Sequence, residues 1–129
     1  MGLVDAGEAL LELTRLSAEI ESAAVLDSAG TVRASTAGAD VDRLACVAAE
    51  LLDIAAPVRP DETVDRVEVS LSSGVVFVVR AGELVVIATT TPEPAAALVV
   101  HDLRTCLARI GPSPRPTAGK RRKADPVDA

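Results

Sequence analysis

The sequence has very few aromatic residues: it contains no Trp and no Tyr, and Phe77 is its one Phe. About half of its 129 residues are nonetheless hydrophobic, so Ala, Val and Leu must fill the interior. This length suits one domain whose core can form without disulfides or a structural metal. Ligand pockets usually have aromatic walls and a few convergent polar groups, so the composition disfavours a small-molecule site.

Residues that commonly carry chemistry are also scarce. Cys46 and Cys106 form no CxxC pair, which argues against a disulfide framework and favours a reducing, cytoplasmic location. His101 is the one His, and Asp102 beside it points elsewhere on a helix, so no metal site is expected. The chain has no GxSxG, Walker A or GxGxxG motif. We therefore expect a non-enzyme with no catalytic, cofactor-binding or metal-binding residue.

Long apolar runs and lysine are both missing from the first 110 residues. No segment approaches the roughly 18 apolar residues that span a bilayer, and Met1–Gly7 lacks the basic residues of a signal peptide. Residues 1–110 hold 17 acidic and 8 basic residues, a net charge of −9. An acidic body repels a phosphate backbone, so we expect this domain to bind no nucleic acid.

Residues 111–129 differ in composition, with five basic and two acidic residues among many Pro and Gly. The sequence therefore predicts one domain over residues 1–110 and a disordered basic tail over residues 111–129. The cluster Lys120–Lys123 leaves several roles open: solubility, a weak contact with anionic lipid, or attraction to an acidic surface, including that of its own domain. Four basic residues alone make no stable membrane anchor.

Hydrophobic periodicity predicts the element order α-β-β-α-β-β-β-α. The predicted elements are a helix from about Asp5 to Glu21, strands Ala23–Asp27 and Thr31–Thr36, a helix over Ala39–Ala56 capped by Asp40, strands over residues 66–71, Val75–Val79 and Leu84–Ala88, and a helix that starts within Thr91–Pro94 and stops at Gly111. The last two strands are apolar throughout, which indicates burial on both faces. The expected fold is α/β of the α+β kind, a five-stranded antiparallel sheet with helices on both faces.

The second predicted helix has an unusually wide apolar surface. Its polar residues fall within roughly 100° of arc at 100° per residue; they are Asp42, Arg43, Cys46, Glu50 and Asp53. An ordinary surface helix has an apolar stripe of about 100°, and this helix has roughly twice that. It must therefore be covered from two directions, by the sheet and by either another helix of the chain or a second copy of itself.

The pattern resembles the roadblock family (dynein light-chain and LAMTOR-like proteins) over residues 5–110. The resemblance is carried by the hairpin Ala24–Val32, the Ala- and Leu-rich second helix, and the Gly82 turn before Leu84–Ala88. The scarcity of aromatics and the basic tail depart from the family pattern. The resemblance implies that the second helix lies alone on one sheet face, and that two protomers join through their third strands and second helices.

That implied arrangement assigns a dimer interface to this sequence. On the second helix, Val41, Leu44, Ala48, Leu52 and Ala55 would face the sheet, and one flank would meet the partner copy. The flank of Val47, Leu51 and Ile54 is preferred over that of Ala45, Ala49 and Ala56, because larger groups bury more area. On the third strand the interface residues are Arg66, Val67, Glu68 and Val69. Arg66 and Glu68 would either pair across the two-fold axis or simply keep an edge strand charged.

The resemblance also implies a function. Several bacterial members act as dimers on a small Ras-like GTPase, which implies a dimeric regulator or scaffold of such a GTPase here. The expected partners are a second copy or a related roadblock protein, and a Ras-like GTPase. The docking surface would be the polar arc of the second helix: Asp42, Arg43, Cys46, Glu50 and Asp53. Two alternatives remain: a ligand-sensing module of the profilin, PAS or GAF kind, and a purely structural dimeric adaptor.

Overall fold

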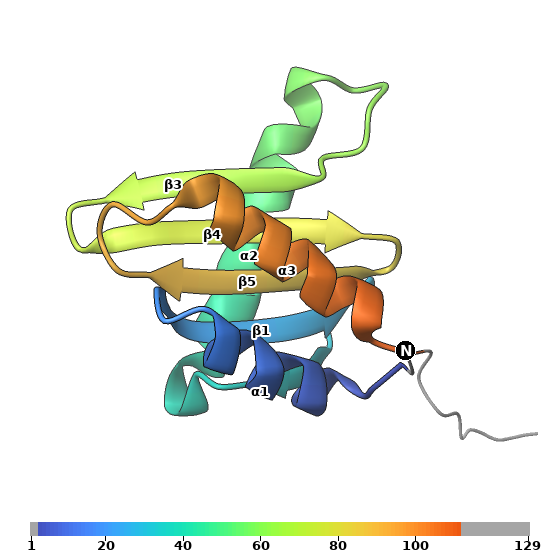
Figure 1. Cartoon of the computed structure of the whole chain (residues 1–129). Coiled ribbons are helices and arrows are strands. Elements are labelled where there is room, and N and C mark those ends of the chain that lie inside the picture. The colour runs from blue at the N-terminus through green and yellow to red at the C-terminus, as the bar shows by residue number, and fades with distance from the viewer. Residues whose placement is uncertain (1–2, 112–129) are drawn as a thin grey trace, which may run out of the picture.

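The computed structural model of the chain describes residues 3–111, and residues 1–2 and 112–129 lie outside that part. Its elements follow the predicted order (Figure 1). They are α1 (Ala6–Leu16), β1 (Ile20–Asp27), β2 (Val32–Ser35), α2 (Val41–Ala55), β3 (Arg66–Leu71), β4 (Gly74–Ala81), β5 (Leu84–Thr90) and α3 (Ala96–Arg109). Short 3-10 turns, Gly38–Asp40 and Ala56–Val58, flank α2.

The five strands form one sheet in the order β2-β1-β5-β4-β3, with every neighbouring pair antiparallel. The hairpin between β1 and β2 is closed by Asp27, whose Oδ1 accepts hydrogen bonds from the backbone N of Ala29 (2.9 Å) and Thr31 (3.0 Å). Gly30 supplies the positive φ, +85°, that this turn needs. The predicted five-stranded antiparallel sheet is confirmed.

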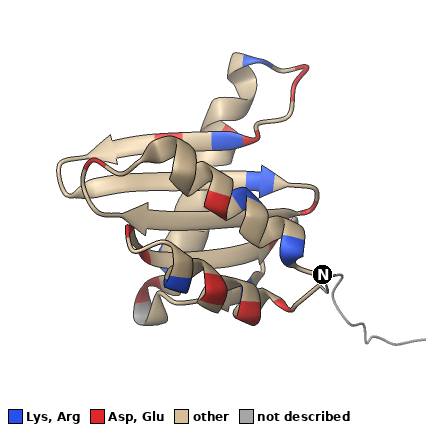
Figure 2. Ribbon diagram, in the orientation of Figure 1, with Lys and Arg blue, Asp and Glu red and all other residues tan. Residues whose placement is uncertain are grey.

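Helices cover both faces of the sheet, as the uninterrupted apolar strands predicted. α1 and α3 lie side by side on one face, and α2 crosses the other (Figure 1). The core under α1 and α3 is built around Phe77, with Leu10 and Leu103 fully buried beside it. The core under α2 contains Val78 and Ile87. Charged side chains lie mostly on helices, turns and strand ends, and the central strand β5 carries none, whereas the edge strand β3 carries a charge within its length (Figure 2).

Two helix ends differ from the prediction. α1 ends at Leu16 rather than near Glu21, because Ile20 already pairs with Thr90 in the sheet. α3 begins at Ala96 rather than within Thr91–Pro94. Glu93 has φ of +55°, which no helix residue adopts. The backbone N of Ala95 instead donates to the carboxylate of Glu19, at 3.2 and 3.3 Å.

The start of α2 also differs. Asp40 was expected to cap this helix, but its side chain makes no capping hydrogen bond. A 3-10 turn precedes α2 and gives Asp40 the dihedral angles φ −90° and ψ 5°, outside the extended region of an N-cap. Its carboxylate lies 3.6 Å from the guanidinium of Arg43.

The two ends of the described chain are fastened together. The backbone N of Val4 donates to the carbonyl of Arg109 at 2.8 Å, and the N of Gly111 donates to the carbonyl of Val4 at 2.9 Å. Arg109 also forms an ion pair with Glu12 of α1. These contacts join α1 to the end of α3 and hold Gly111 beside Val4.

Candidate functional site: an interaction surface on α2 and β3

α2 is much less buried than the other two helices. Ala48 is its one buried residue, whereas α1 buries four residues and α3 buries five. The expected sheet-facing side chains of Val41, Leu44, Leu52 and Ala55 are only half-buried. One helix laid across a sheet face cannot cover its own wide apolar arc. The chain by itself therefore covers that arc only in part, and Ala49 and Ile54 remain exposed on its two flanks.

The larger apolar flank of α2 becomes more exposed toward its C-terminal end. Val47 and Leu51 are half-buried against the core of this face, and Ile54 is 72% exposed. Val58, one turn beyond Ile54, is 75% exposed. Val58 was missed in the sequence because the predicted second helix ends at Ala56, although the spacing of four from Ile54 to Val58 indicates the same flank.

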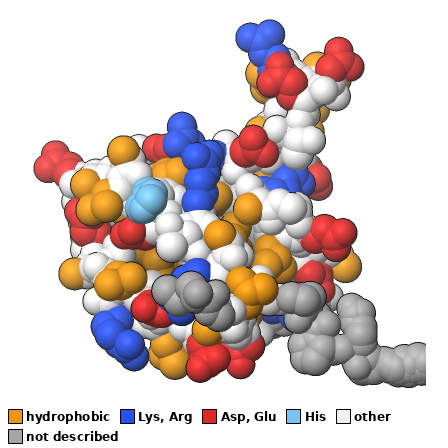
Figure 3. Space-filling model, turned by 45° about the vertical axis from the view of Figure 1, so that its right-hand side comes forward, with side chains coloured by type: hydrophobic (Ala, Val, Ile, Leu, Met, Phe, Trp, Pro, Cys, Tyr) orange, Lys and Arg blue, Asp and Glu red, His pale blue; other side chains and the backbone are white. Residues whose placement is uncertain are grey.

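This exposed end of α2 extends past the edge of the sheet. Figure 1 shows the last turns of α2 and the loop after them standing beyond β3, and Figure 3 shows this part projecting from the body. Within the described residues β3 pairs with β4 alone, so its other edge is unpaired. Ile54, in the last turn of α2, and Val58, in the 3-10 turn that follows, therefore lie in a segment that the sheet of this chain does not cover.

The residues of β3 divide between the two faces of the sheet. Val67 and Val69 pair with Val78 and Val76, which belong to the core under α2, so they share a face with α2. Leu71 continues this row and is 56% exposed. The predicted interface residues Arg66 and Glu68 lie on the opposite face.

The two charged residues of β3 also bind each other. Arg66 Nε lies 3.5 Å from a carboxylate oxygen of Glu68, and the two side chains are 46% and 37% exposed. Such an exposed pair contributes little to stability, at most about 1 kcal/mol. The geometry of the single chain is compatible both with a charged edge strand and with an exchange of partners across a two-fold axis.

The polar arc of α2 lies on the surface as one continuous strip. All five of its residues are exposed: Asp42, Arg43, Cys46, Glu50 and Asp53. The Cys46 thiol lies 3.7 Å from Glu50 Oε2, and Arg43 pairs with Asp40. The structure thus brings the predicted partner-binding residues together on the side of α2 that faces away from the sheet.

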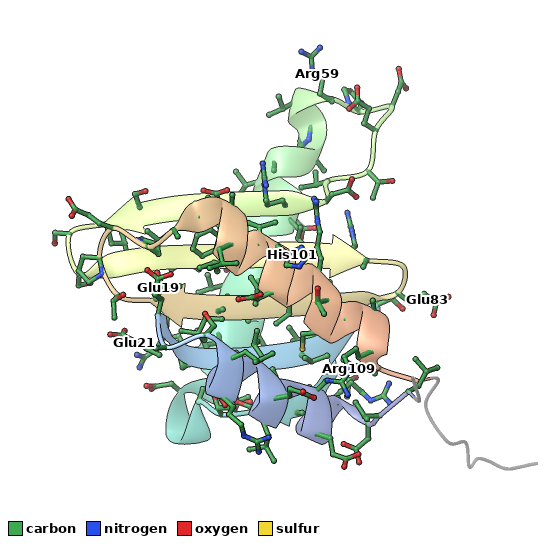
Figure 4. All side chains as sticks on the ribbon, in the orientation of Figure 1. Glu19, Glu21, Arg59, Glu83, His101 and Arg109 are labelled. Carbon is green, nitrogen blue, oxygen red and sulfur yellow. The ribbon has the colours of Figure 1, made fainter. Side chains whose placement is uncertain are left out.

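Two residues of types that commonly carry catalysis, Cys106 and His101, both lie on α3. Cys106 is buried in α3, and burial raises the pKa of its thiol to about 11 although Arg109 lowers it. A protonated thiol is a poor nucleophile. His101 is exposed on α3, pointing away from the sheet (Figure 4). Within residues 3–111 no three His, Cys, Asp or Glu side chains are grouped to hold a metal, and none of the helices there could cross a membrane.

Comparison with known proteins finds similarity of structure only. No protein-family model matches the sequence, and no curated protein matches it. A Roadblock/LC7 domain from Streptomyces avermitilis superposes with a TM-score of 0.72 at 22% identity, covering 81% of this chain and 93% of that one. Myxococcus xanthus MglB gives 0.60 at 12% identity, covering 81% and 86%. LokiProfilin1, from its complex with rabbit actin, gives 0.58 at 11% identity, covering 83% and 96%.

These likenesses concern the fold, since the identities are all below 25%. They confirm the fold that was expected from the order of elements and the Asp27–Gly30 hairpin. The profilin likeness reflects the same plan of an antiparallel sheet between helices, at a lower TM-score than the Streptomyces domain. The chain has the fold of the Roadblock/LC7 domain.

Proposed function

We propose that this chain is a non-enzymatic homodimer that regulates or scaffolds a small Ras-like GTPase in bacterial signalling. The observation that carries the dimer is the uncovered flank of α2 beside the unpaired edge of β3. Large apolar side chains left exposed next to a free strand edge commonly mark a protein interface. The GTPase rests on the family resemblance that the element order and the hairpin suggested.

A second copy would satisfy both unpartnered features at once. If β3 of each protomer pairs with β3 of the other in antiparallel fashion, the two sheets become one and neither third strand keeps a free edge. The overhanging end of α2, with Ile54, and the 3-10 turn after it, with Val58, would then cover the partner copy's third strand. The row that it would cover is the one that includes Leu71, already 56% exposed in the single chain.

The charges of β3 fit the same arrangement. In an antiparallel pair centred on Val67, Arg66 of one chain stands opposite Glu68 of the other. Each side chain can then exchange its present partner 3.5 Å away for the equivalent one across the axis. Such pairs would select the antiparallel orientation more than they would add stability.

Dimerisation would also bring two polar arcs together into one docking surface. Each arc carries three carboxylates and one guanidinium, so the joined surface is acidic and suits a basic patch on the partner. Arg43 is already paired with Asp40, which favours a role in orientation over a role in chemistry.

Calorimetry with a bacterial Ras-like GTPase, taken from beside this gene where one is encoded there, tests the proposal on the GDP-bound and GTP-analogue-bound forms of that GTPase. Glu50→Lys should weaken binding by roughly threefold to tenfold, since an exposed ion pair contributes up to about 1 kcal/mol and reversal adds repulsion. Glu21→Lys, an equal change of charge on β1, is the matched control and should leave affinity unchanged. Absence of binding in both nucleotide states would instead support the adaptor without a GTPase.

A further inference from the structure

A groove lies on the other flank of α2, opposite Ile54. It has a volume of about 300 Å³ and runs between α2 and the two turns that end β1 and β4. Its floor is apolar and is formed by small side chains of α2, Ala45, Ala48 and Ala49, together with Leu52. The small size of these alanines creates the hollow, because no side chain from α2 fills the space beside the turns.

The rim of this groove is acidic. Asp27, Asp53 and Glu83 line it, and none of them forms an ion pair with another of the described residues. Arg80 is the one basic residue of the lining, and its guanidinium is engaged elsewhere. Its Nε and Nη2 donate to the carbonyl of Val64 at 3.0 and 2.7 Å. The groove thus has a net charge of −2, with its cation held on a backbone carbonyl.

An apolar floor below an acidic rim matches the chemistry of Lys and Arg side chains. Their aliphatic stems pack on apolar surface while the charged ends stay at the rim, where carboxylates can pair with them. The sequence itself contains such a segment, Lys120–Lys123, in a stretch with net charge +3 attached to a body with net charge −9. This segment lies outside the described residues, so the match is one of chemistry and reach.

The point of attachment places the segment within reach. Gly111 is fixed beside Val4, and Figure 4 shows Arg109, two residues earlier, at the same end of the sheet as Glu83. Nine residues lead from Gly111 to Lys120 and can span at most about 30 Å. That reach exceeds twice the radius of gyration of a domain of this size, about 13 Å.

We propose that Lys120–Lys123 docks in the groove between α2 and the turns at Asp27–Gly30 and Gly82–Glu83 of its own chain. Single exposed ion pairs are weak. A short tether, however, gives an effective concentration in the millimolar range, so an intrinsic dissociation constant of about 1 mM is enough for substantial occupancy.

Docking also has a consequence for the polar arc of α2. Asp53 belongs both to the groove and to the strip assigned to partner binding. The docked tail would therefore compete with a basic partner for Asp53 and act as a built-in competitor. This consequence rests on the proposed function, whereas the docking itself does not.

The test uses the full chain with a spin label near the basic cluster, on Ala124→Cys in a Cys46→Ser background. Cys106 is buried and its thiol is protonated at neutral pH, so it should not take the label. Paramagnetic broadening of backbone amide signals reports which surface the label visits. We expect broadening at Asp53, Gly82 and Glu83, and its loss in Glu83→Lys and in about 1 M salt, where the Debye length falls to about 3 Å.

Glu21→Lys is the control, because it changes the body's charge equally but away from the groove, and it should leave the broadening in place. Unbroadened groove amides, or broadening that survives Glu83→Lys, would overturn the proposal. A mixture of isotope-labelled chain without spin label and unlabelled chain with it should show no groove broadening. Groove broadening as strong in that mixture as in the singly labelled chain would contradict docking within one chain. No GTPase takes part, so failure here leaves the proposed function standing.

Discussion

Replacing Ile54 by Glu tests the proposed dimer most sharply, because Ile54 contributes little to the fold of the single chain. Its side chain is 72% exposed there. Complete burial of an Ile is worth about 1.5–3 kcal/mol, so covering the exposed part in a dimer is worth about 1–2 kcal/mol. A symmetric interface contains the residue twice, which gives about 2–4 kcal/mol and a dimer dissociation constant raised roughly 30- to 700-fold.

Sedimentation velocity over a dilution series measures this dissociation constant. Leu11→Glu is the matched control, since Leu11 is 60% exposed on α1, on the opposite face of the sheet. It introduces the same charge and removes a similar apolar group, yet it should leave the dimer unchanged. Equal effects of the two substitutions, or no effect of Ile54→Glu, would refute the assignment of this flank to the interface. Circular dichroism should show both variants folded.

Three further predictions concern the fold and its thiols. Gly74→Ala should lower the free energy of unfolding by about 1–3 kcal/mol or more, because its Cβ would lie 1.9 Å from the carbonyl oxygen of Thr90. Gly82→Ala places its Cβ within 4 Å of no atom and should lower the free energy of unfolding by only about 1 kcal/mol. Urea denaturation compares the two variants. Phe77→Ala should cost about 3–5 kcal/mol in the same assay, since Phe77 is fully buried, and a loss below 1 kcal/mol would contradict its central place in the core. A thiol reagent at pH 8 should modify the exposed Cys46 and leave Cys106 unmodified. The pKa of about 11 keeps the Cys106 thiol protonated until the pH approaches that value or the protein unfolds. Rapid modification of two thiols in the native protein would contradict this prediction.

The element order and sheet type could be predicted because each depends on local pattern. In the Asp27–Gly30 turn, Asp27 accepts the hydrogen bonds and Gly30 adopts the positive φ. The turn can therefore be predicted from the sequence of these four residues alone. The boundaries of the helices were less predictable, because tertiary contacts decide them. β1 begins at Ile20 through its pairing with Thr90, and α3 begins late because Glu19 takes the backbone N of Ala95.

The candidate interface was predictable in outline and not in detail. The helical arc of α2 follows from spacing alone, and its five polar residues do lie together on the surface. The position of α2 across the sheet is a tertiary property, and it decides that Ile54 overhangs β3 while Val47 is half-buried. The ion pair of Glu12 with Arg109 joins residues far apart in the chain, and no local pattern indicates it.

The mass of the full chain in solution tests the central claim most directly. Light scattering coupled to size exclusion, at a concentration of tens of micromolar and moderate salt, should give twice the chain mass of 13.2 kDa. That result would agree with the joined third strands and covered helix flanks proposed above. A mass of 13.2 kDa that persists as concentration rises would contradict the account, because the apolar flank of α2 and the edge of β3 would then stay uncovered.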